Sequence, residues 1–321
     1  MEFIKIRMKK KAIIISIKGI RLSKKEKSLL SNEYPWGLIL FKRNIKSFNQ
    51  IKKLIIEIKK LTKDKNFPIL IDEEGLLVSR LRNIFSNNFD ANYFGKLYKL
   101  NQNTALTLYE KYLEDLCKKL KQIGININTI PVLDVLRETT NKIIGKRSFS
   151  NNEKIVKKLG EVSIKKCHSC NILTVIKHIP GHGCSSLDSH LNMPKVNLSE
   201  KVLNKKDFYP FKSSKAKLAM TAHILYSKID SKNVSTFSSK IINKIIRKKL
   251  GFKGILMSDD ISMRALKYDL ITNAKKSLAA GCNLVLYCAG NTRDNFKLIK
   301  SVPYIDKFTS KKTSEIYKIL R

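Results

Sequence analysis

The chain has 321 residues, and its 64 Lys and Arg against 26 Asp and Glu give a formal net charge of +38. That length fits one large domain or two small ones. Hydrophobic residues make up 43% of the chain, which is enough to bury a sizeable core, so intrinsic disorder is excluded despite the charge.

The positive charge is spread along the chain in short runs. Lys and Arg occur mostly as doublets or triplets, as at residues 9–11, 118–119 and 248–249, mostly inside stretches with helical periodicity. Such runs are typical of solvated helix faces. We therefore predict no specific nucleic-acid partner. A basic, non-enzymatic nucleic-acid-associated protein stays open as an alternative, which rests on the net charge of +38.

The first twenty residues place a basic stretch before a short apolar run at residues 12–17. This run is shorter than the apolar region of a secretory signal, and no Ala-x-Ala cleavage site follows it, so we interpret it as a buried strand. No run reaches the roughly 18 apolar residues of a spanning helix. We expect a cytoplasmic protein without a membrane partner, and six reduced cysteines, including the lone Cys167-x-x-Cys170 pair.

Short β-branched runs alternate with longer amphipathic stretches along the whole chain. This alternation predicts an α/β protein, namely a single-domain (β/α)8 TIM-type barrel over residues 1–321 with a short C-terminal tail after about 300. A doubly wound open sheet is the competing fold, but no Gly-x-Gly-x-x-Gly follows any predicted strand. The predicted strands span residues 12–17, 37–41, 69–71, 125–132, 173–176, 218–222, 254–257 and 283–287, and the predicted helices 47–61, 102–123, 152–167, 238–250 and 272–280.

Charged residues or histidines follow five of the predicted strands. A barrel gathers such positions at the mouth formed by the carboxyl ends of its strands. Any one of them could instead cap a helix or be a satisfied buried histidine. Their coincidence indicates an active site at the mouth. The residues are Asp72, Asp134, Lys177 with His178, His223, and Asp259 with Asp260, of which the last two point to opposite sides of their strand.

The segment at residues 177–190 holds three of the five histidines, and its Gly and Pro exclude a helix. Asp188 and His190 are two residues apart, so in an extended loop both point to the same side and form a candidate acid/base dyad. The alternative is a metal-dependent barrel hydrolase that uses His178, His182 and His190 as ligands. The neighbouring Lys177 would repel a cation, and we predict no bound metal.

Several segments together resemble the beta-N-acetylhexosaminidases of glycoside hydrolase family 3, especially the single-domain bacterial type that works in cell-wall recycling. The resemblance extends from about residue 12 to about 290. It implies a retaining exo-glycosidase, monomeric and without a cofactor, that removes terminal beta-linked N-acetylglucosamine from muropeptides of peptidoglycan. The segments are 177–183 with 188–190, 251–263 and 37–41, extended by 72–75, 131–135, 144–149 and 220–223.

The family's roles carry over to matching positions. Asp259 resembles the nucleophile that forms a covalent glycosyl-enzyme, and His190 resembles the acid/base residue with Asp188 as its partner. Retaining glycosidases commonly use two carboxylates about 5 to 5.5 Å apart, and this group replaces one by a loop histidine. Because a histidine need not repel an anion, phosphate could attack in place of water. The residues that resemble the sugar ligands are Asp72, Arg80, Arg147, Lys177 and His178.

The sequence departs from the family pattern in three places. Leu76-Leu77 stands where the family usually has Gly-Arg, Lys146 stands where an Asp usually precedes Arg147, and the carboxyl end is short. If the glycine position requires φ > 0, the loop after residue 72 sits differently here. Arg147 would also lose an orienting partner. We expect these changes to lower activity or shift substrate preference.

Overall fold

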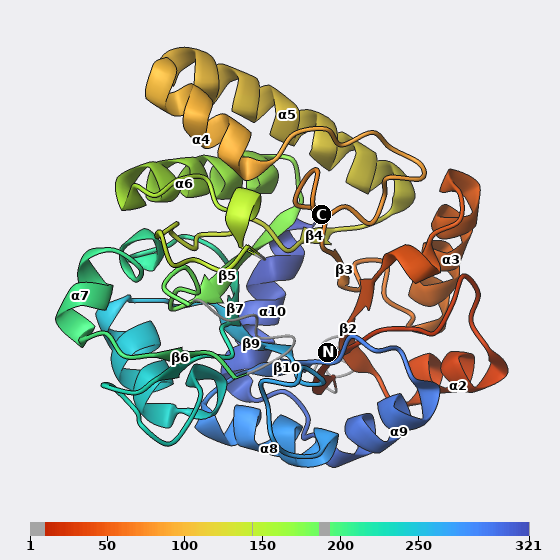
Figure 1. Cartoon of the computed structure of the whole chain (residues 1–321). Helices are drawn as coiled ribbons and strands as arrows, with labels where there is room; N and C mark the ends of the chain where they lie inside the picture. Colours follow the sequence, from red (N-terminus) through yellow and green to blue (C-terminus); the bar gives the residue numbers. More distant parts are fainter. Residues whose placement is uncertain (1–9, 143, 186–192, 321) are drawn as a thin grey trace.

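A closed barrel of parallel strands, seen end-on and ringed by helices, forms the body of the protein (Figure 1). The computed structural model describes residues 10–142, 144–185 and 193–320. Around the barrel the strands follow the order β1-β10-β9-β7-β5-β4-β3-β2, and every neighbouring pair is parallel. The predicted (β/α)8 barrel is confirmed. Its strands are β1 (Lys11–Ile15), β2 (Pro35–Leu40), β3 (Ile69–Ile71), β4 (Ile127–Asn128), β5 (Leu173–Ile179), β7 (Leu218–Thr221), β9 (Ile255–Asp260) and β10 (Leu284–Leu286).

All eight predicted strands are present, but two extend further at their carboxyl ends than predicted. β5 continues to Ile179 and β9 to Asp260, so Lys177, His178 and Asp259 lie within strands and not after them. A charged residue is compatible with a barrel strand where its side chain enters the mouth. A second, two-stranded parallel sheet, β6 (Lys195–Val196) with β8 (Leu225–Tyr226), was not predicted.

The helices surround the barrel and begin at the polar residues that the sequence offers as caps. Ser47 and Asn152 accept backbone N–H groups at the starts of α3 and α6, and Gly124 ends α5 in the left-handed conformation. The predicted helix at 238–250 is a π-helix in the structure. The helices are α2 (Lys24–Asn32), α3 (Phe48–Leu61), α4 (Ala91–Leu100), α5 (Gln102–Ile123), α6 (Glu153–Ser169), α7 (Glu200–Lys205), α8 (Leu270–Ala280), α9 (Thr292–Ser301) and α10 (Lys307–Ile319), with η1 (Lys42–Asn44), η2 (Gly145–Arg147), η3 (Tyr209–Phe211), η4 (Ser235–Phe237) and the π-helix η5 (Ile241–Lys249).

Two buried apolar layers explain why the strands are almost continuously hydrophobic. Successive side chains of a strand point to opposite faces, and both faces of a barrel wall are covered. In β1, Ile14 belongs to the cluster inside the barrel, whereas Ile13 and Ile15 belong to the layer between the barrel and its helices. This packing holds the strand ends, and hence the mouth, in fixed positions.

The segment after residue 300 forms α10, which packs against the interior cluster of the barrel. Ile316 and Tyr317 of this helix share that cluster with Ile14. The indole Nε1 of the buried Trp36, at the start of β2, donates to Thr313 Oγ1 over 2.9 Å. Because Trp36 lies at the amino end of its strand, α10 contacts the end of the barrel opposite the mouth.

A close contact between α4 and the loop after β4 yields a stability prediction. A Cβ placed on Gly95 would lie 1.7 Å from the carbonyl oxygen of Phe149. Since backbone must move to accept it, Gly95→Ala is expected to lower the free energy of unfolding by about 3 kcal/mol or more. Urea unfolding measures this, with the exposed neighbour Lys96→Ala as the control. Equal midpoints for the two variants would contradict the tight packing.

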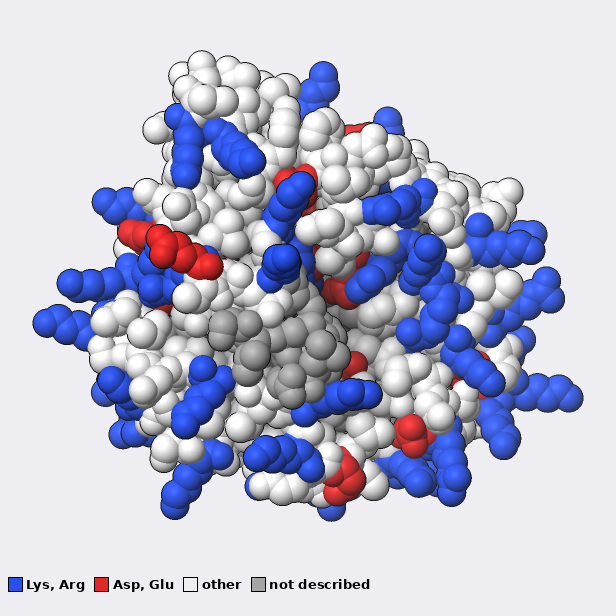
Figure 2. Space-filling model, in the orientation of Figure 1, with Lys and Arg blue, Asp and Glu red and all other residues white. Residues whose placement is uncertain are grey.

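The surface carries its basic side chains on many elements and not in one patch. Figure 2 shows Lys and Arg all around the face that is turned toward the viewer, and acidic atoms inside a hollow near its centre. Among residues 10–142, 144–185 and 193–320, no helix combines the length and apolar composition that a bilayer crossing requires. The hollow with its acidic atoms is the feature of the face in Figure 2 that calls for a chemical explanation, because acidic residues are few in this basic protein.

Candidate active site

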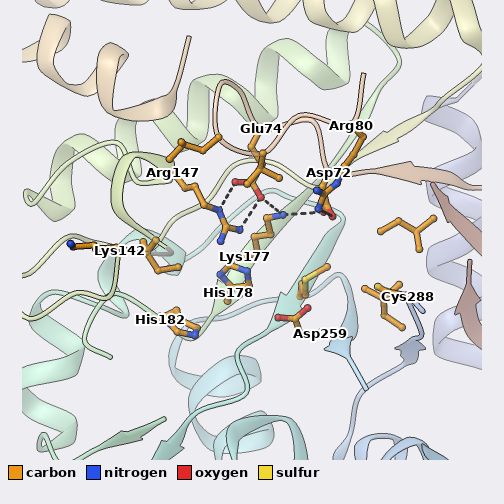
Figure 3. A pocket seen from close by; sticks show the side chains of 16 residues that line it. Asp72, Glu74, Arg80, Lys142, Arg147, Lys177, His178, His182, Asp259 and Cys288 are labelled. Atoms are coloured by element: carbon orange, nitrogen blue, oxygen red, sulfur yellow. Dashed lines mark hydrogen bonds and ion pairs between the residues drawn. The ribbon is translucent and has the colours of Figure 1, made fainter. Parts of the chain in front are cut away.

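A pocket of about 400 Å³ opens at the mouth of the barrel, where the carboxyl ends of several strands meet (Figure 3). Its walls combine charged side chains with a minority of apolar ones. Six of the eight residues predicted for catalysis or sugar binding line it, Asp259 among them. The lining comprises Asp72, Glu74, Arg80, Lys142, Arg147, Lys177, His178, His182, Asp259 and Cys288, with Ile39, Leu77, Val78, Ile144, Met220 and Leu286.

Five charged side chains form a continuous series of ion pairs in the pocket (Figure 3). Arg80 Nη2 lies 3.1 Å from Asp72 Oδ2, and Lys177 Nζ lies 3.2 Å from Asp72 Oδ1. The same Nζ lies 2.6 Å from Glu74 Oε1. Arg147 holds Glu74 from the other side by two contacts, of 2.7 Å from Nε and 2.9 Å from Nη2. Residues from three separate segments are thereby fixed relative to one another.

Burial and charge act in opposite directions on the two carboxylates of this series. Burial alone would raise the pKa of Glu74, but Arg147 and Lys177 outweigh it and lower that pKa to about 2. For Asp72, burial is likewise outweighed by Lys177 and Arg80, and its pKa lies far below the usual range. Both groups are therefore ionised at neutral pH and present acceptor oxygens to a ligand.

A third carboxylate, Glu73, anchors the loop that carries Arg80. Its Oε2 accepts the backbone N–H groups of Arg80 and Leu81 over 2.8 and 3.0 Å, and its Oε1 accepts Asn87 Nδ2 over 2.7 Å. Asn128 Oδ1, on β4, in turn accepts the backbone N–H of Glu73 over 3.0 Å. The loop between β3 and α4 is thus tied to the barrel by a buried side chain.

The two substitutions that the sequence marks as departures leave the network in place. The left-handed residue of the loop is Gly75, with φ +143°, and Leu76 is not among the described residues with positive φ, so the expected conflict at Leu76 does not arise. Lys146 is exposed, and Glu74 orients Arg147 in place of the missing Asp. The expectation that Arg147 lacks an orienting partner is therefore wrong, whereas the displacement of the loop relative to the family pattern stays a prediction.

His178 is held in a defined orientation by Asp134, which is buried beneath it. Nδ1 of His178 lies 2.7 Å from Asp134 Oδ2, and Asp134 Oδ1 accepts the backbone N–H of His182 over 2.6 Å. Burial would raise the pKa of Asp134, but His178 outweighs it and the pKa is lowered. A carboxylate that fixes one ring nitrogen leaves Nε2 as the nitrogen available to a ligand.

Asp259 enters the same pocket from β9 (Figure 3), whereas its neighbour Asp260 does not line it. The Asp260 carboxylate instead accepts backbone N–H groups of Ser262 and Cys288, over 3.0 and 3.1 Å. Adjacent strand residues point to opposite sides, as predicted for this pair. Asp259 is consequently the carboxylate of β9 that a ligand in the pocket can reach.

The remaining predicted residues fall outside the pocket or outside the described chain. His223 is buried between Thr236 Oγ1, at 2.7 Å, and the carbonyl oxygen of Asp260, at 3.0 Å, so it fills a structural position. The predicted dyad of Asp188 and His190 lies outside the described residues. The metal alternative needs His190, so it stays a prediction; the described pair His178 and His182 has ring centroids 5.6 Å apart.

Because the pKa of Glu74 is lowered in the folded protein, we predict that the protein loses stability in acid. Its ionised form stabilises the fold fully above the ordinary pKa of 4.5, and this stabilisation disappears as pH falls toward about 2. Glu74→Gln is therefore expected to flatten the fall in the free energy of unfolding between pH 5 and pH 3. Urea titrations at the two pH values measure it, with the exposed Glu138→Gln as the control. An undiminished fall in Glu74→Gln would contradict the assignment.

Comparison with known proteins gives this geometry a family. The model of the glycosyl hydrolase family 3 N-terminal domain matches residues 5–313. The chain belongs to glycosyl hydrolase family 3. This hydrolase is 33% identical to a beta-hexosaminidase of Actinobacillus succinogenes over 305 residues, which cover 92% of this chain and 87% of that protein. It is 32% identical to a beta-hexosaminidase of Haemophilus influenzae, over 91% of this chain and 85% of that one.

A solved structure resembles the family 3 enzyme over nearly its full length. NagZ from Neisseria gonorrhoeae, in complex with N-trifluoroacetyl-D-glucosamine, superposes with a TM-score of 0.86 at 29% identity, covering 96% of this chain and 90% of that one. The resemblance predicted from the sequence is confirmed, and the protein is a glycoside hydrolase of the beta-hexosaminidase group.

Sequence reasoning assigned no role to Glu74 or Lys142, which both line the pocket. Glu74 comes two residues after Asp72, so in an extended segment the two side chains point to the same side, and this spacing could have indicated Glu74.

Proposed function

We propose that this glycoside hydrolase is a retaining exo-beta-N-acetylglucosaminidase that acts through a covalent intermediate on Asp259. One observation supports the proposal most directly. Asp259 lines the same small pocket as the ion-paired side chains of Asp72, Arg80, Lys177 and Glu74. Fixed donors and acceptors of both signs suit the many hydroxyl groups of a sugar. The described chain acts as one catalytic domain.

The chemistry follows the double displacement of retaining glycosidases. Asp259 attacks the anomeric carbon while His190 donates a proton to the glycosidic oxygen, which breaks the bond to the leaving group. His190 then takes a proton from water, whose oxygen attacks the same carbon and releases Asp259. Asp188 orients His190 and stabilises its protonated form.

The other pocket residues hold the sugar in place for this attack. Asp72 and Glu74 accept hydrogen bonds from its hydroxyl groups, and Arg80, Arg147, Lys177 and His178 donate to its oxygens. Burial and His178 lower the pKa of His182 to about 4, so this imidazole is neutral at pH 7 and adds no charge beside the reacting centre.

Two features support a terminal amino sugar as the substrate. The pocket has a volume of about 400 Å³ and is lined by the ion-paired side chains, so we infer that its inner part takes one terminal sugar and not the middle of a polymer. The relatives are named beta-hexosaminidases, and the related NagZ structure holds an N-acylated glucosamine derivative. We infer a muropeptide of peptidoglycan as the natural substrate, in cytoplasmic cell-wall recycling by a monomer that needs no cofactor.

Hydrolysis of an aryl N-acetyl-beta-glucosaminide by the purified protein, with a chelator present, tests the proposal. The parent is expected to release the aryl alcohol, His190→Ala to do so much more slowly, and both to keep their rates with chelator. Loss of activity with chelator and recovery with zinc would favour the metal alternative. Product analysis in phosphate buffer is expected to give free sugar, and a sugar 1-phosphate would mean that phosphate is the acceptor.

A further inference from the structure

Leu77 differs from the other apolar residues of the pocket in its exposure. It lines the pocket and is nevertheless 56% exposed, whereas Ile39, Met220 and Leu286 of the same lining are buried. A residue that is both part of the lining and open to solvent belongs to the rim. Single exposed leucines are common on protein surfaces, so exposure alone does not indicate a role for Leu77. The relevant observation is that this exposed leucine lies at the mouth of the pocket.

The loop holds Leu77 at this rim in a defined position. The backbone N–H groups of Glu74 and Gly75 both donate to the carbonyl oxygen of Val78, over 2.8 and 3.2 Å, which closes a turn around Leu77. The backbone N–H of Leu76 donates to the carbonyl oxygen of Phe89 over 2.9 Å. With Glu73 anchoring the following residues, Leu77 is a preorganised part of the site and not a loose loop tip.

The apolar surface continues outward from Leu77. Leu76, Phe89 and Tyr93 are each about 40% exposed, at 38%, 43% and 44%. The ring centroids of Phe89 and Tyr93 lie 5.0 Å apart, and the backbone N–H of Leu76 donates a hydrogen bond to the carbonyl oxygen of Phe89. These residues extend the apolar character of the rim toward α4. A group that leaves the pocket on this side would meet an apolar surface despite the high positive charge of the protein.

We propose that Leu77 is a specificity-determining residue that contacts the aglycone and favours aglycones with an apolar face. The inference rests on the proposed function, in which the terminal sugar fills the inner pocket and the glycosidic oxygen points to the mouth. Everything beyond that oxygen must then pass the rim. The described residues of the rim include Leu77 and the exposed Lys142. An apolar group buries more apolar area against Leu77 than against Lys142, so contact with Leu77 is favoured.

The test compares two substrates on each variant. The ratio of kcat/KM for 4-nitrophenyl to that for methyl N-acetyl-beta-glucosaminide cancels the intrinsic difference between leaving groups when variants are compared. Leu77→Ala is expected to lower this ratio about three- to tenfold, since it removes apolar contact area from one substrate only. Leu77→Met, which keeps that area, is expected to retain the ratio.

Two controls separate a direct contact from a general disturbance. Leu100→Ala removes a leucine that is 84% exposed and lies outside the pocket lining, and it is expected to leave the ratio unchanged. Product inhibition by free N-acetylglucosamine, which fills the sugar part alone, is expected to stay constant in Leu77→Ala. A larger inhibition constant there would show that the sugar position had moved, and would overturn the proposal.

The remaining outcomes are distinguishable from failure of the proposed function. A parent protein that cleaves neither substrate would contradict the glycosidase activity itself. A parent that cleaves both, with the ratio unchanged in Leu77→Ala, would overturn the role of Leu77 alone. A ratio altered by Lys142→Ala and unaltered by Leu77→Ala would also overturn it and assign the aglycone contact to Lys142.

Discussion

Asp259→Ala is expected to lower kcat for an aryl N-acetyl-beta-glucosaminide on the order of 10⁴-fold, because the pocket then lacks the carboxylate that attacks the anomeric carbon. Sodium azide is expected to restore part of the rate. The small anion enters the space left by the carboxylate and forms the C–N bond as the aryl alcohol leaves, which gives an alpha-linked glycosyl azide. Rate measurements with and without azide, and product identification, check both expectations.

A control on the same βα unit distinguishes this effect from misfolding. Asp269 caps α8 through its side chain and is exposed, and Asn is an equally good cap, so Asp269→Asn is expected to keep parental activity. Thermal unfolding of Asp259→Ala should remain cooperative. Undiminished activity in folded Asp259→Ala would remove Asp259 from the mechanism, and a beta-linked azide would contradict direct displacement.

Lys177→Met is expected to have the largest effect on stability among the pocket residues. Lys177 is 2% exposed and its ammonium bridges Asp72 and Glu74, so its removal leaves two buried carboxylates with one cation less between them. Breaking a buried ion pair from one side costs about 3 to 5 kcal/mol. Urea unfolding at pH 7 measures the loss, and kcat/KM should fall with it because Asp72 loses its orientation.

A second substitution in the same network tests the electrostatic origin of this loss. Adding Glu74→Gln to Lys177→Met removes one of the uncompensated charges, so the double variant is expected to lose less stability than the sum of the two single variants. Lys146→Met, at an exposed position next to Arg147 in the chain, serves as the matched control for loss of a cation. Strict additivity would indicate that Lys177 acts through packing alone.

The fold could be read from the sequence because barrel strands are short, apolar and separated by amphipathic helices. The errors arose where that pattern fails. β5 and β9 carry Lys177 and Asp259 inside the strand, and polar residues at a strand end look like the start of a loop. β6 and β8 have two residues each, too few for any periodicity to emerge.

The site was predictable where residues share a motif and not where they meet only in space. Asp72, Lys177 and His178 stand out at strand ends. Nothing in the chain links Glu74 to Arg147, which are 73 residues apart and paired only after folding. The sequence likewise could not show that Gly75, and not Leu76, adopts the positive φ of this loop.

The inner pocket combines opposite charges in equal number, three carboxylates (Asp72, Glu74, Asp259) and three cations (Arg80, Arg147, Lys177), while the whole protein carries +38. A neutral sugar that replaces water in this pocket is therefore surrounded by charges whose sum is zero. Buried pairs are also screened little by salt, whereas exposed charges are screened strongly. Turnover of an uncharged glycoside should therefore be nearly independent of ionic strength, even though adsorption of the protein to polyanions should fall steeply as salt is added.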